Sequence, residues 1–228
     1  MIDLYAIHLD KIQSLIPDLY HSVLNTTEKQ HISRQKIENV RKQRVLSRAI
    51  LRLILGCHTH EPAQNLQIHT SKYGKPYLKN QNLYFNVSHT KHMLIVALST
   101  QYDVGIDIEY KNTDIQTQNL PKQCFHPQEW EYFQSLSHNK KQLFFLEMWT
   151  KKEAASKAIG LGFHYPFQQI NTLENNHSLN INSYKIQQHI ITTPRKHYIV
   201  ALASVSASPC QPTPWQELHL EWIKQCLT

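Results

Sequence analysis

One apolar segment occurs twice in this 228-residue chain, and this repeat constrains the fold more than any other feature of the sequence. The two copies are residues 93–99 (MLIVALS) and residues 198–204 (YIVALAS), and both contain Ile-Val-Ala-Leu. A short, continuous apolar run of this kind is typical of a strand that is buried on both faces. Two such strands about a hundred residues apart predict two similarly built halves, with a junction near residue 102.

A long helix is predicted in each half. The first is expected at about residues 26–55, with Asn25 and Glu28 placed for a capping box and Gly56 at its end. The second is expected at about residues 139–160, because no Gly or Pro interrupts this segment before its last residue. The chain is therefore predicted to be an α/β (α+β) protein.

The rest of the domain organisation follows from the two ends of the chain. Residues 1–9 have a strand-like pattern, whereas the tail at 206–228 contains three prolines before a short amphipathic stretch and is expected to be peripheral. We therefore predict an N-terminal half at 1–102 and a C-terminal half at 103–228.

Residues 104–110 (VGIDIEY) alternate between apolar and other side chains, which predicts a strand with one buried face. Asp107 and Glu109 lie on the opposite face, about 6.6 Å apart along the strand. Two carboxylates at that spacing can bind one cation, and Mg²⁺ prefers oxygen ligands. The alternative is a solvated polar face on an edge strand, which is the commoner explanation of a lone Asp-x-Glu.

Further along the chain, Glu153 and Lys157 are four residues apart in the second predicted helix and therefore share a face. Considered alone, they indicate a surface ion pair that contributes about 0.3–0.5 kcal/mol. Only their combination with the strand at 104–110 favours a functional site.

Together, these segments resemble the paired signature of the 4′-phosphopantetheinyl transferases. The signature is a Gly-(Ile/Val)-Asp-x-Glu strand followed by a helix with Trp-(Ser/Thr/Cys)-x-Lys-Glu and a further Lys. It is met here by Gly105, Asp107 and Glu109, and then by Trp149, Thr150, Lys152, Glu153 and Lys157. Residues 73–76 (YGKP), 85–89 (FNVSH) and 125–129 (FHPQE) are similar to further elements of the family, in the same order.

The resemblance implies a fold and an activity. The fold is a pseudo-dimer in which each half packs a long helix on a small, largely antiparallel sheet, with the active site in the cleft between the halves. The activity is transfer of the phosphopantetheine arm of coenzyme A to a serine of apo acyl or peptidyl carrier proteins, with release of adenosine 3′,5′-bisphosphate. Length and layout suggest the monomeric, broad-specificity, surfactin-synthetase-activating branch, which serves peptide and polyketide synthases.

The resemblance also implies the roles of individual residues. Asp107, Glu109 and Glu153 would bind Mg²⁺, with Mn²⁺ as an alternative. Glu153 is the candidate general base, and Lys157 and His89 would act on the phosphate oxygens. The residues expected to bind coenzyme A are Lys29, Arg48, Lys75, Pro76, Ser88, His89, Lys152 and Lys157.

The set of basic residues expected to bind the 3′-phosphate departs from the family pattern at one position. Relatives often have a second basic residue three positions after Lys29, where this chain has Ile32. Either His31 or Arg34 substitutes for it, or the 3′-phosphate is bound less tightly.

Composition narrows the classes of function. The formal charge of +7 and a pI near 9.2 suit an anionic ligand or an acidic partner. The five glycines form neither a Gly-x-Gly-x-x-Gly motif nor a Walker loop. No apolar run approaches the roughly 20 residues of a membrane span. The four cysteines show no Cys-x-x-Cys spacing, which indicates reduced thiols in a cytoplasmic protein.

Two other segments of the sequence suggest a metal site or a nucleic-acid surface. The segment 57–60 (CHTH) resembles a metal ligand pair, but without a second pair at zinc-like spacing it is expected to be a polar loop. A basic stripe in the first helix, typical of a solvated face, allows a nucleic-acid-binding protein or metal-dependent phosphodiesterase that uses the same carboxylates. Its members are Arg41, Arg44, Arg48 and Arg52. We favour the transferase, with no nucleic acid and no membrane among its partners and with carrier docking around 110–130.

Overall fold

The computed structural model describes residues 1–79, 81–111, 120, 122–173, 178–181, 184–192, 198–205 and 212–227. Its N-terminal elements are β1 (Ile2–His8), η1 (Leu9–Leu15), α1 (Ile16–Ser22), α2 (Thr26–Ser33), α3 (Glu38–Thr59), η2 (Ala63–Asn65), β2 (Ile68–Thr70), β3 (Pro76–Leu78), β4 (Tyr84–His89) and β5 (Met93–Ser99). The later elements are β6 (Val104–Tyr110), η4 (Lys122–Cys124), α4 (Pro127–Ser135), α5 (His138–Ile159), η5 (Gly162–His164), η6 (Phe167–Gln169), β7 (Ser178–Ile181), β8 (Tyr184–Thr192), β9 (Tyr198–Val205), β10 (Gln216–Glu217) and α6 (Leu220–Leu227).

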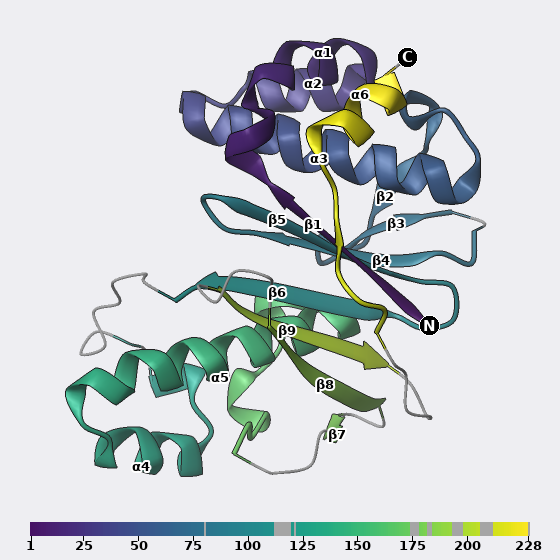
Figure 1. The fold of residues 1–228 in the computed structure, drawn as a ribbon. Helices are drawn as coiled ribbons and strands as arrows, with labels where there is room; N and C mark the ends of the chain where they lie inside the picture. Colours follow the sequence, from purple (N-terminus) through teal and green to yellow (C-terminus); the bar gives the residue numbers. More distant parts are fainter. Residues whose placement is uncertain are drawn as a thin grey trace.

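Two four-stranded sheets lie between the two long helices (Figure 1). One sheet has the order β10-β1-β5-β4 and the other has the order β6-β9-β8-β7, while β2 and β3 form a separate hairpin. All strand pairs in these sheets are antiparallel except β1 with β10. The mixed α/β fold with small antiparallel sheets confirms the predicted fold class.

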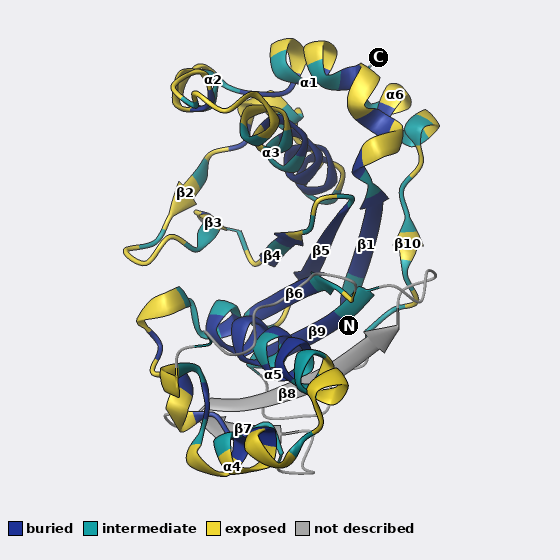
Figure 2. Ribbon diagram, turned by 90° about the vertical axis from the view of Figure 1, so that its left-hand side faces the viewer, coloured by how far each residue is buried: buried dark blue, intermediate teal, exposed yellow. Residues whose placement is uncertain are grey.

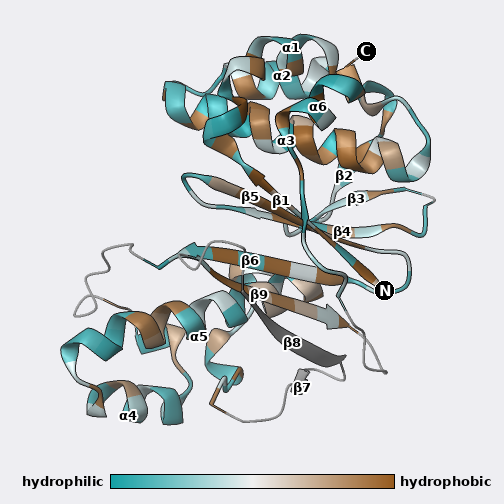
Figure 3. Cartoon of the chain, viewed as in Figure 1, coloured by the Kyte–Doolittle hydropathy of each residue, from teal (hydrophilic) through white to brown (hydrophobic). Residues whose placement is uncertain are grey.

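Alternating side chains divide the interior into layers. In β5, Leu94 and Val96 pack with α3 in one apolar cluster, whereas Ile95 and Ala97 pack against the other sheet. In β9, alternate residues likewise face the first sheet or α5. The layer order is therefore α3, first sheet, second sheet, α5. Figure 2 shows the central strands and the inward sides of both helices buried, and Figure 3 shows hydrophobic residues along β1, β5, β6 and β9.

The single helix predicted at 26–55 is wrong, because the structure has two helices there, α2 and α3. The capping box of Asn25 and Glu28 is present at the start of α2. Residues 33–37 carry one apolar side chain, Ile37, which is 65% exposed, so no buried face extends a helix through this segment.

The end of α3 also differs from the prediction. The helix passes Gly56 and is closed by His60 in the left-handed conformation, with φ of 56°. Residues 57–59 therefore belong to the last turn of α3 and not to a polar loop, and His58 Nε2 lies 2.7 Å from the hydroxyl of Tyr5. By contrast, the second long helix and the strands at 1–9 and 104–110 are confirmed within one or two residues.

The tail packs onto the N-terminal half, which corrects the expectation of a peripheral segment. Strand β10 pairs with β1, and Ile223 of α6 is fully buried in the apolar cluster around α3. The amphipathic spacing of α6 explains this contact. The division at residue 102 otherwise stays a prediction. None of the helices in the described ranges is both long and apolar enough to cross a membrane.

Candidate active site

The site forms where β6 lies against α5. A Cβ placed on Gly105 would meet the Ala154 carbonyl oxygen at 2.1 Å and the Ala158 amide nitrogen at 2.2 Å. Glycine therefore permits a backbone approach that no other residue could make. Asp107 follows two residues later on the same face and points to the same helix, which carries Glu153 and Lys157.

Lys157 connects three elements at this point. Its Nζ lies 2.6 Å from Oδ1 of Asp107 on β6 and 3.2 Å from Oγ of Ser88 on β4. Ser88 in turn donates a hydrogen bond of 2.8 Å to the same Asp107 oxygen. Residues of β4, β6 and α5 thus meet in one polar cluster.

Two carboxylates of this cluster are buried and Glu109 is half-buried, so the strand face at Asp107 is not a solvated one. Asp107 is 5% exposed and Glu153 is 7% exposed. Burial, followed by the charge of Asp107, raises the pKa of Glu109 to about 7, although Lys157 acts in the opposite direction. Burial also raises the pKa of Glu153. Glu109 and Glu153 are therefore disfavoured as carboxylates beside Asp107, and a positive charge additional to Lys157 would favour their ionised forms.

The oxygen atoms of these carboxylates fit a divalent cation. Asp107 Oδ2 and Glu153 Oε1 are buried and have no hydrogen-bond partner among the described residues. Leaving such atoms unpaired is costly, and a hard cation with oxygen ligands would satisfy them. Within the described residues, no three His, Cys, Asp or Glu side chains already stand at coordinating distances. Instead, Lys157 contacts Oδ1 of Asp107.

A cavity of about 560 Å³ opens beside this cluster, between α2, α3 and the β2–β3 hairpin. His89 lies in its wall, and Gln43 Nε2 approaches His89 Nδ1 at 3.2 Å. Because the Gln43 amide nitrogen can only donate, Nδ1 accepts and Nε2 of His89 carries the proton. Burial lowers the pKa of His89, which favours the neutral imidazole with Nε2 available as a donor.

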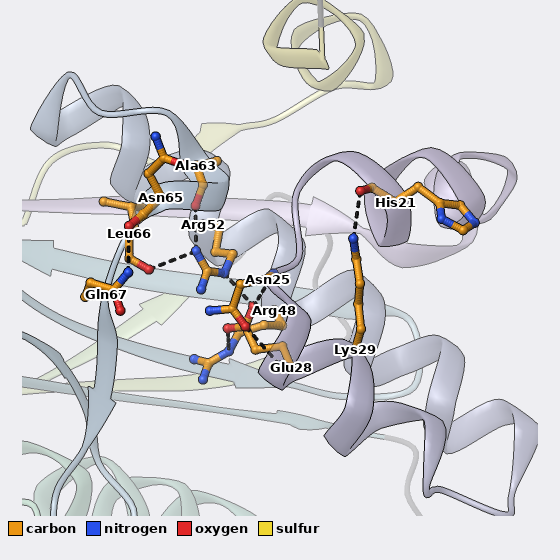
Figure 4. A network of polar contacts seen from close by, with 10 residues as sticks. All are labelled: His21, Asn25, Glu28, Lys29, Arg48, Arg52, Ala63, Asn65, Leu66 and Gln67. Atoms are coloured by element: carbon orange, nitrogen blue, oxygen red, sulfur yellow. Dashed lines mark hydrogen bonds and ion pairs between the residues drawn. The ribbon is translucent and has the colours of Figure 1, made fainter.

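The basic residues predicted for the 3′-phosphate separate into two groups. Arg48 lines the cavity, as do His31 and Ile32, whereas Arg34 is not among its lining residues. Lys29 is turned away, because its Nζ donates a hydrogen bond of 2.8 Å to the carbonyl of His21 (Figure 4). Residues 28, 31 and 32 share one helical face, and position 29 is on another. In this conformation Lys29 does not reach the cavity, contrary to its predicted role.

Lys75 and Pro76 lie on the hairpin that faces the second half. Pro76 lines the large cavity. Lys75 Nζ is held 2.6 Å from Oδ1 of Asp103 and 2.8 Å from the carbonyl of Ala158. Burial lowers the pKa of this ammonium group. Lys75 also borders a smaller cavity of about 290 Å³ together with Lys157.

The predicted ligand contact of Lys152 is contradicted by its position. Its side chain is fully buried, and Nζ lies 2.6 Å from Oε2 of Glu129, which is equally buried. It also donates to the carbonyls of Cys124 and Phe167, both at 2.9 Å. Lys152 therefore anchors α5 to the segments around it and cannot reach a ligand.

Sequence reasoning missed two polar residues that support the site. Asn86 Oδ1 accepts a hydrogen bond of 2.9 Å from the Ile106 amide and so joins β4 to β6. Glu28 was interpreted only as a capping residue, yet it binds two arginines (Figure 4). The sequence could have predicted the arginine contacts of Glu28, because a capping glutamate next to a basic helix has arginines within reach.

Comparison with known proteins gives a consistent result over most of the chain. Residues 103–203 match a family model described as 4′-phosphopantetheinyl transferase superfamily, and residues 18–101 match one described as 4′-phosphopantetheinyl transferase, N-terminal. The chain is 32% identical over 165 residues to 4′-phosphopantetheinyl transferase HetI of Nostoc sp., which covers 71% of this chain and 69% of HetI.

Two further relatives match shorter stretches. 4′-Phosphopantetheinyl transferase gsp of Aneurinibacillus migulanus is 37% identical over 106 residues, which is 46% of this chain and 43% of that protein. The L-aminoadipate-semialdehyde dehydrogenase-phosphopantetheinyl transferase of Mus musculus is 27% identical over 156 residues, which is 63% of this chain and 50% of that protein. In these two matches the chain spans about half the length of the relative or less.

Proposed function

Because this chain belongs to the 4′-phosphopantetheinyl transferase superfamily, we propose that it transfers the phosphopantetheine arm of coenzyme A to a serine of an apo carrier protein. The serine oxygen attacks the β-phosphorus of coenzyme A. The bond from that phosphorus to the bridging oxygen breaks, and adenosine 3′,5′-bisphosphate leaves. The product is a holo acyl or peptidyl carrier protein.

The observation that carries this proposal is a pair of buried carboxylate oxygens, Asp107 Oδ2 and Glu153 Oε1, beside the Lys157 ammonium. Neither oxygen has a hydrogen-bond partner in the part of the chain that the structure describes. Asp107, Glu109 and Glu153 would hold Mg²⁺ or Mn²⁺, which when bound supplies positive charge to the pyrophosphate oxygens of coenzyme A. Phosphoryl transfer depends mainly on positioning and charge neutralisation, and this site offers both.

Protein side chains would supply the general base and the groups that bind the phosphate oxygens. Glu153 would accept the serine proton. Burial raises the pKa of Glu153, which favours this role, whereas a bound cation would lower that pKa. Lys157, which is 2.6 Å from Asp107, would bind non-bridging phosphate oxygens. Ser88 would donate to the ligand only after its hydroxyl leaves Asp107 Oδ1. His89 would donate a hydrogen bond through Nε2 to the same phosphates from the cavity wall.

The large cavity would hold the nucleotide end of coenzyme A. Arg48 is the basic residue of its wall that we assign to the 3′-phosphate, with His31 beside Ile32 as the substitute for the missing basic residue. Pro76 would pack against the adenine end, and Lys75 would approach the phosphates from the hairpin. Lys29 would contribute only after leaving the carbonyl of His21.

The partner we propose is an acidic carrier protein of fatty acid, polyketide or peptide assembly, met by a monomeric enzyme in the cytoplasm. The formal charge of +7 favours such a partner through long-range attraction. Docking was predicted at about 110–130, and residues 112–119 and 121 of that segment lie outside the described part of the chain.

The decisive experiment is mass spectrometry of several apo carrier domains incubated with the protein, coenzyme A and Mg²⁺. A mass gain of one phosphopantetheine arm on the carrier, lost when the metal is chelated, is the expected result. No gain on any carrier, together with DNA or RNA binding that falls steeply with salt, would favour the nucleic-acid alternative.

Asp107→Ala tests the metal assignment. This variant should fold and should lose Mg²⁺-dependent loading, because it removes Oδ2, the oxygen proposed to bind the cation. It also removes Oδ1, which contacts Lys157 and Ser88. Circular dichroism and thermal melting control for the fold. Loading at the wild-type rate by a folded Asp107→Ala protein would contradict the assignment.

A further inference from the structure

Glu28 occupies the point where α2, α3 and the large cavity meet. Its amide nitrogen donates to Asn25 Oδ1 at 2.9 Å, and the Asn25 amide donates back to Glu28 Oε2 at 3.1 Å. This capping box fixes the carboxylate on the side of α2 that faces α3. Glu28 is also among the residues that line the cavity.

Two arginines one turn apart on α3 bind the two oxygens of this carboxylate separately. Arg48 Nε lies 2.6 Å from Oε1, and Arg52 Nε lies 2.7 Å from Oε2. The two guanidinium groups would repel each other at this spacing without the carboxylate between them. Glu28 therefore allows both to stay in place.

Arg52 is the fixed member of this triad. Its side chain is fully buried, and Nη1 donates to the carbonyls of Ala63 at 2.6 Å and Leu66 at 3.1 Å. Arg48 is the outward member, with a side chain that is 26% exposed and lines the cavity. Figure 4 shows the outer end of its guanidinium pointing away from Glu28.

The charges of the triad favour an anion at this wall. Two guanidinium groups and one carboxylate leave one net positive charge, and Arg52 is enclosed by protein. The surplus charge is therefore available only through Arg48. A guanidinium held at Nε keeps the geometry to present its outer nitrogens to a phosphate.

We propose that Glu28 is a positioning residue that holds Arg48 at the cavity wall for the 3′-phosphate of coenzyme A, with Arg52 as its buried support. This inference rests on the proposed function for the identity of the ligand. It predicts that Glu28 sets the preference for coenzyme A over 3′-dephospho-coenzyme A through Arg48.

The test is a double-mutant cycle measured by calorimetric binding of both ligands. Glu28→Gln should weaken coenzyme A about tenfold, the loss expected for one charge-assisted hydrogen bond, and should change 3′-dephospho-coenzyme A less than twofold. In an Arg48→Ala background, Glu28→Gln should cause no further loss, because the residue through which it acts is gone.

Two further variants separate positioning from stability. Asn25→Ala removes the side-chain half of the capping box but keeps the Asn25 amide on Glu28 Oε2 and both arginine contacts. It should therefore lower the melting temperature without changing the ratio of the two affinities. If Glu28→Gln does not fold, Glu28→Asp keeps the charge but is too short to reach both arginines, and it should reduce the same ratio.

Equal weakening of both ligands, or a full effect of Glu28→Gln in the Arg48→Ala background, would overturn the inference. Because the readout is binding, it does not depend on turnover. A wild-type protein that binds coenzyme A in preference to 3′-dephospho-coenzyme A but loads no carrier would refute the proposed function and leave the role of Glu28 to be decided by the cycle.

Discussion

Gly105 on β6 lies so close to Ala158 on α5 that a Cβ on the glycine would come within 2.2 Å of the Ala158 amide nitrogen. The obstructing atoms belong to the backbone of α5, so a rotamer change cannot relieve the contact. The same approach brings the carboxylate of Asp107 to Lys157. The glycine of the strand motif is thus a condition for the site, although it has no chemistry of its own.

Gly105→Ala is expected to cost about 3 kcal/mol or more of unfolding free energy, at or above the upper end of the usual range for overpacked sites. Gly74→Ala is the matched control. Gly74 has a φ of 92°, and apart from its two chain neighbours no described residue has an atom within 4 Å of its Cβ position. Its cost is therefore backbone strain of about 1 kcal/mol. Chemical denaturation measures both. Equal costs would mean that the strand can move away from the helix.

Lys152→Met removes one partner of a fully buried ion pair and should destabilise the fold by about 3 kcal/mol. Glu129 keeps donors from the amides of His126 and Thr172, which limits the loss. Lys140→Met, at an exposed position on the same helix, should change stability by less than about 0.5 kcal/mol. The folded fraction of Lys152→Met should bind coenzyme A normally. Weakened binding by folded protein would restore Lys152 as a ligand contact.

The free energy of unfolding should fall at alkaline pH through Tyr5. Burial, followed by the charge of Asp3, raises the pKa of the Tyr5 hydroxyl to about 12, against an ordinary tyrosine value of 10.0. A raised pKa contributes stability that is complete below pH 10 and is lost as pH rises towards 12. The difference between wild type and Tyr5→Phe should therefore shrink by about 1.4 kcal/mol between about pH 9 and pH 11. A constant difference over that range would contradict the assignment.

The two-residue period of the strand and the four-residue spacing in the helix predicted which face of β6 and which face of α5 hold the candidate site residues. Alternation along 104–110 puts Asp107 opposite the apolar residues, and the four-residue spacing puts Glu153 and Lys157 on one side of α5. Both arrangements follow from local backbone geometry, which the sequence encodes directly. The family resemblance then connected the two segments.

Local periodicity could not predict what covers each face. Lys152 is next to Glu153 in the sequence, yet it faces η6 and Glu129, because α5 is packed on two sides. Lys29 is next to Glu28, and its neighbour α1 supplies a carbonyl that takes the ammonium group. The packing of the tail onto β1 depends on contacts more than 200 residues apart in sequence, as between the Leu218 amide and the Ala6 carbonyl. Such contacts are set by the assembled tertiary structure.

Lys75 joins the two halves, and its variants can separate a structural role from a ligand contact. Lys75→Met and Asp103→Asn both break the 2.6 Å ion pair, and each should lower stability by about 1 kcal/mol, because Asp103 is half-exposed and screened by water. Only Lys75→Met removes the ammonium group proposed to approach the phosphates.

We therefore expect weaker binding of coenzyme A from Lys75→Met and near wild-type binding from Asp103→Asn, both measured by calorimetry on folded protein. Equal weakening by the two variants would mean that Lys75 acts only by fixing the hairpin to β6. In the Asp103→Asn protein the Lys75 ammonium group would still be present, with the Ala158 carbonyl, 2.8 Å away in the wild type, as its remaining partner. If binding is nevertheless weakened equally, the phosphates depend on Lys157 and the cavity wall alone.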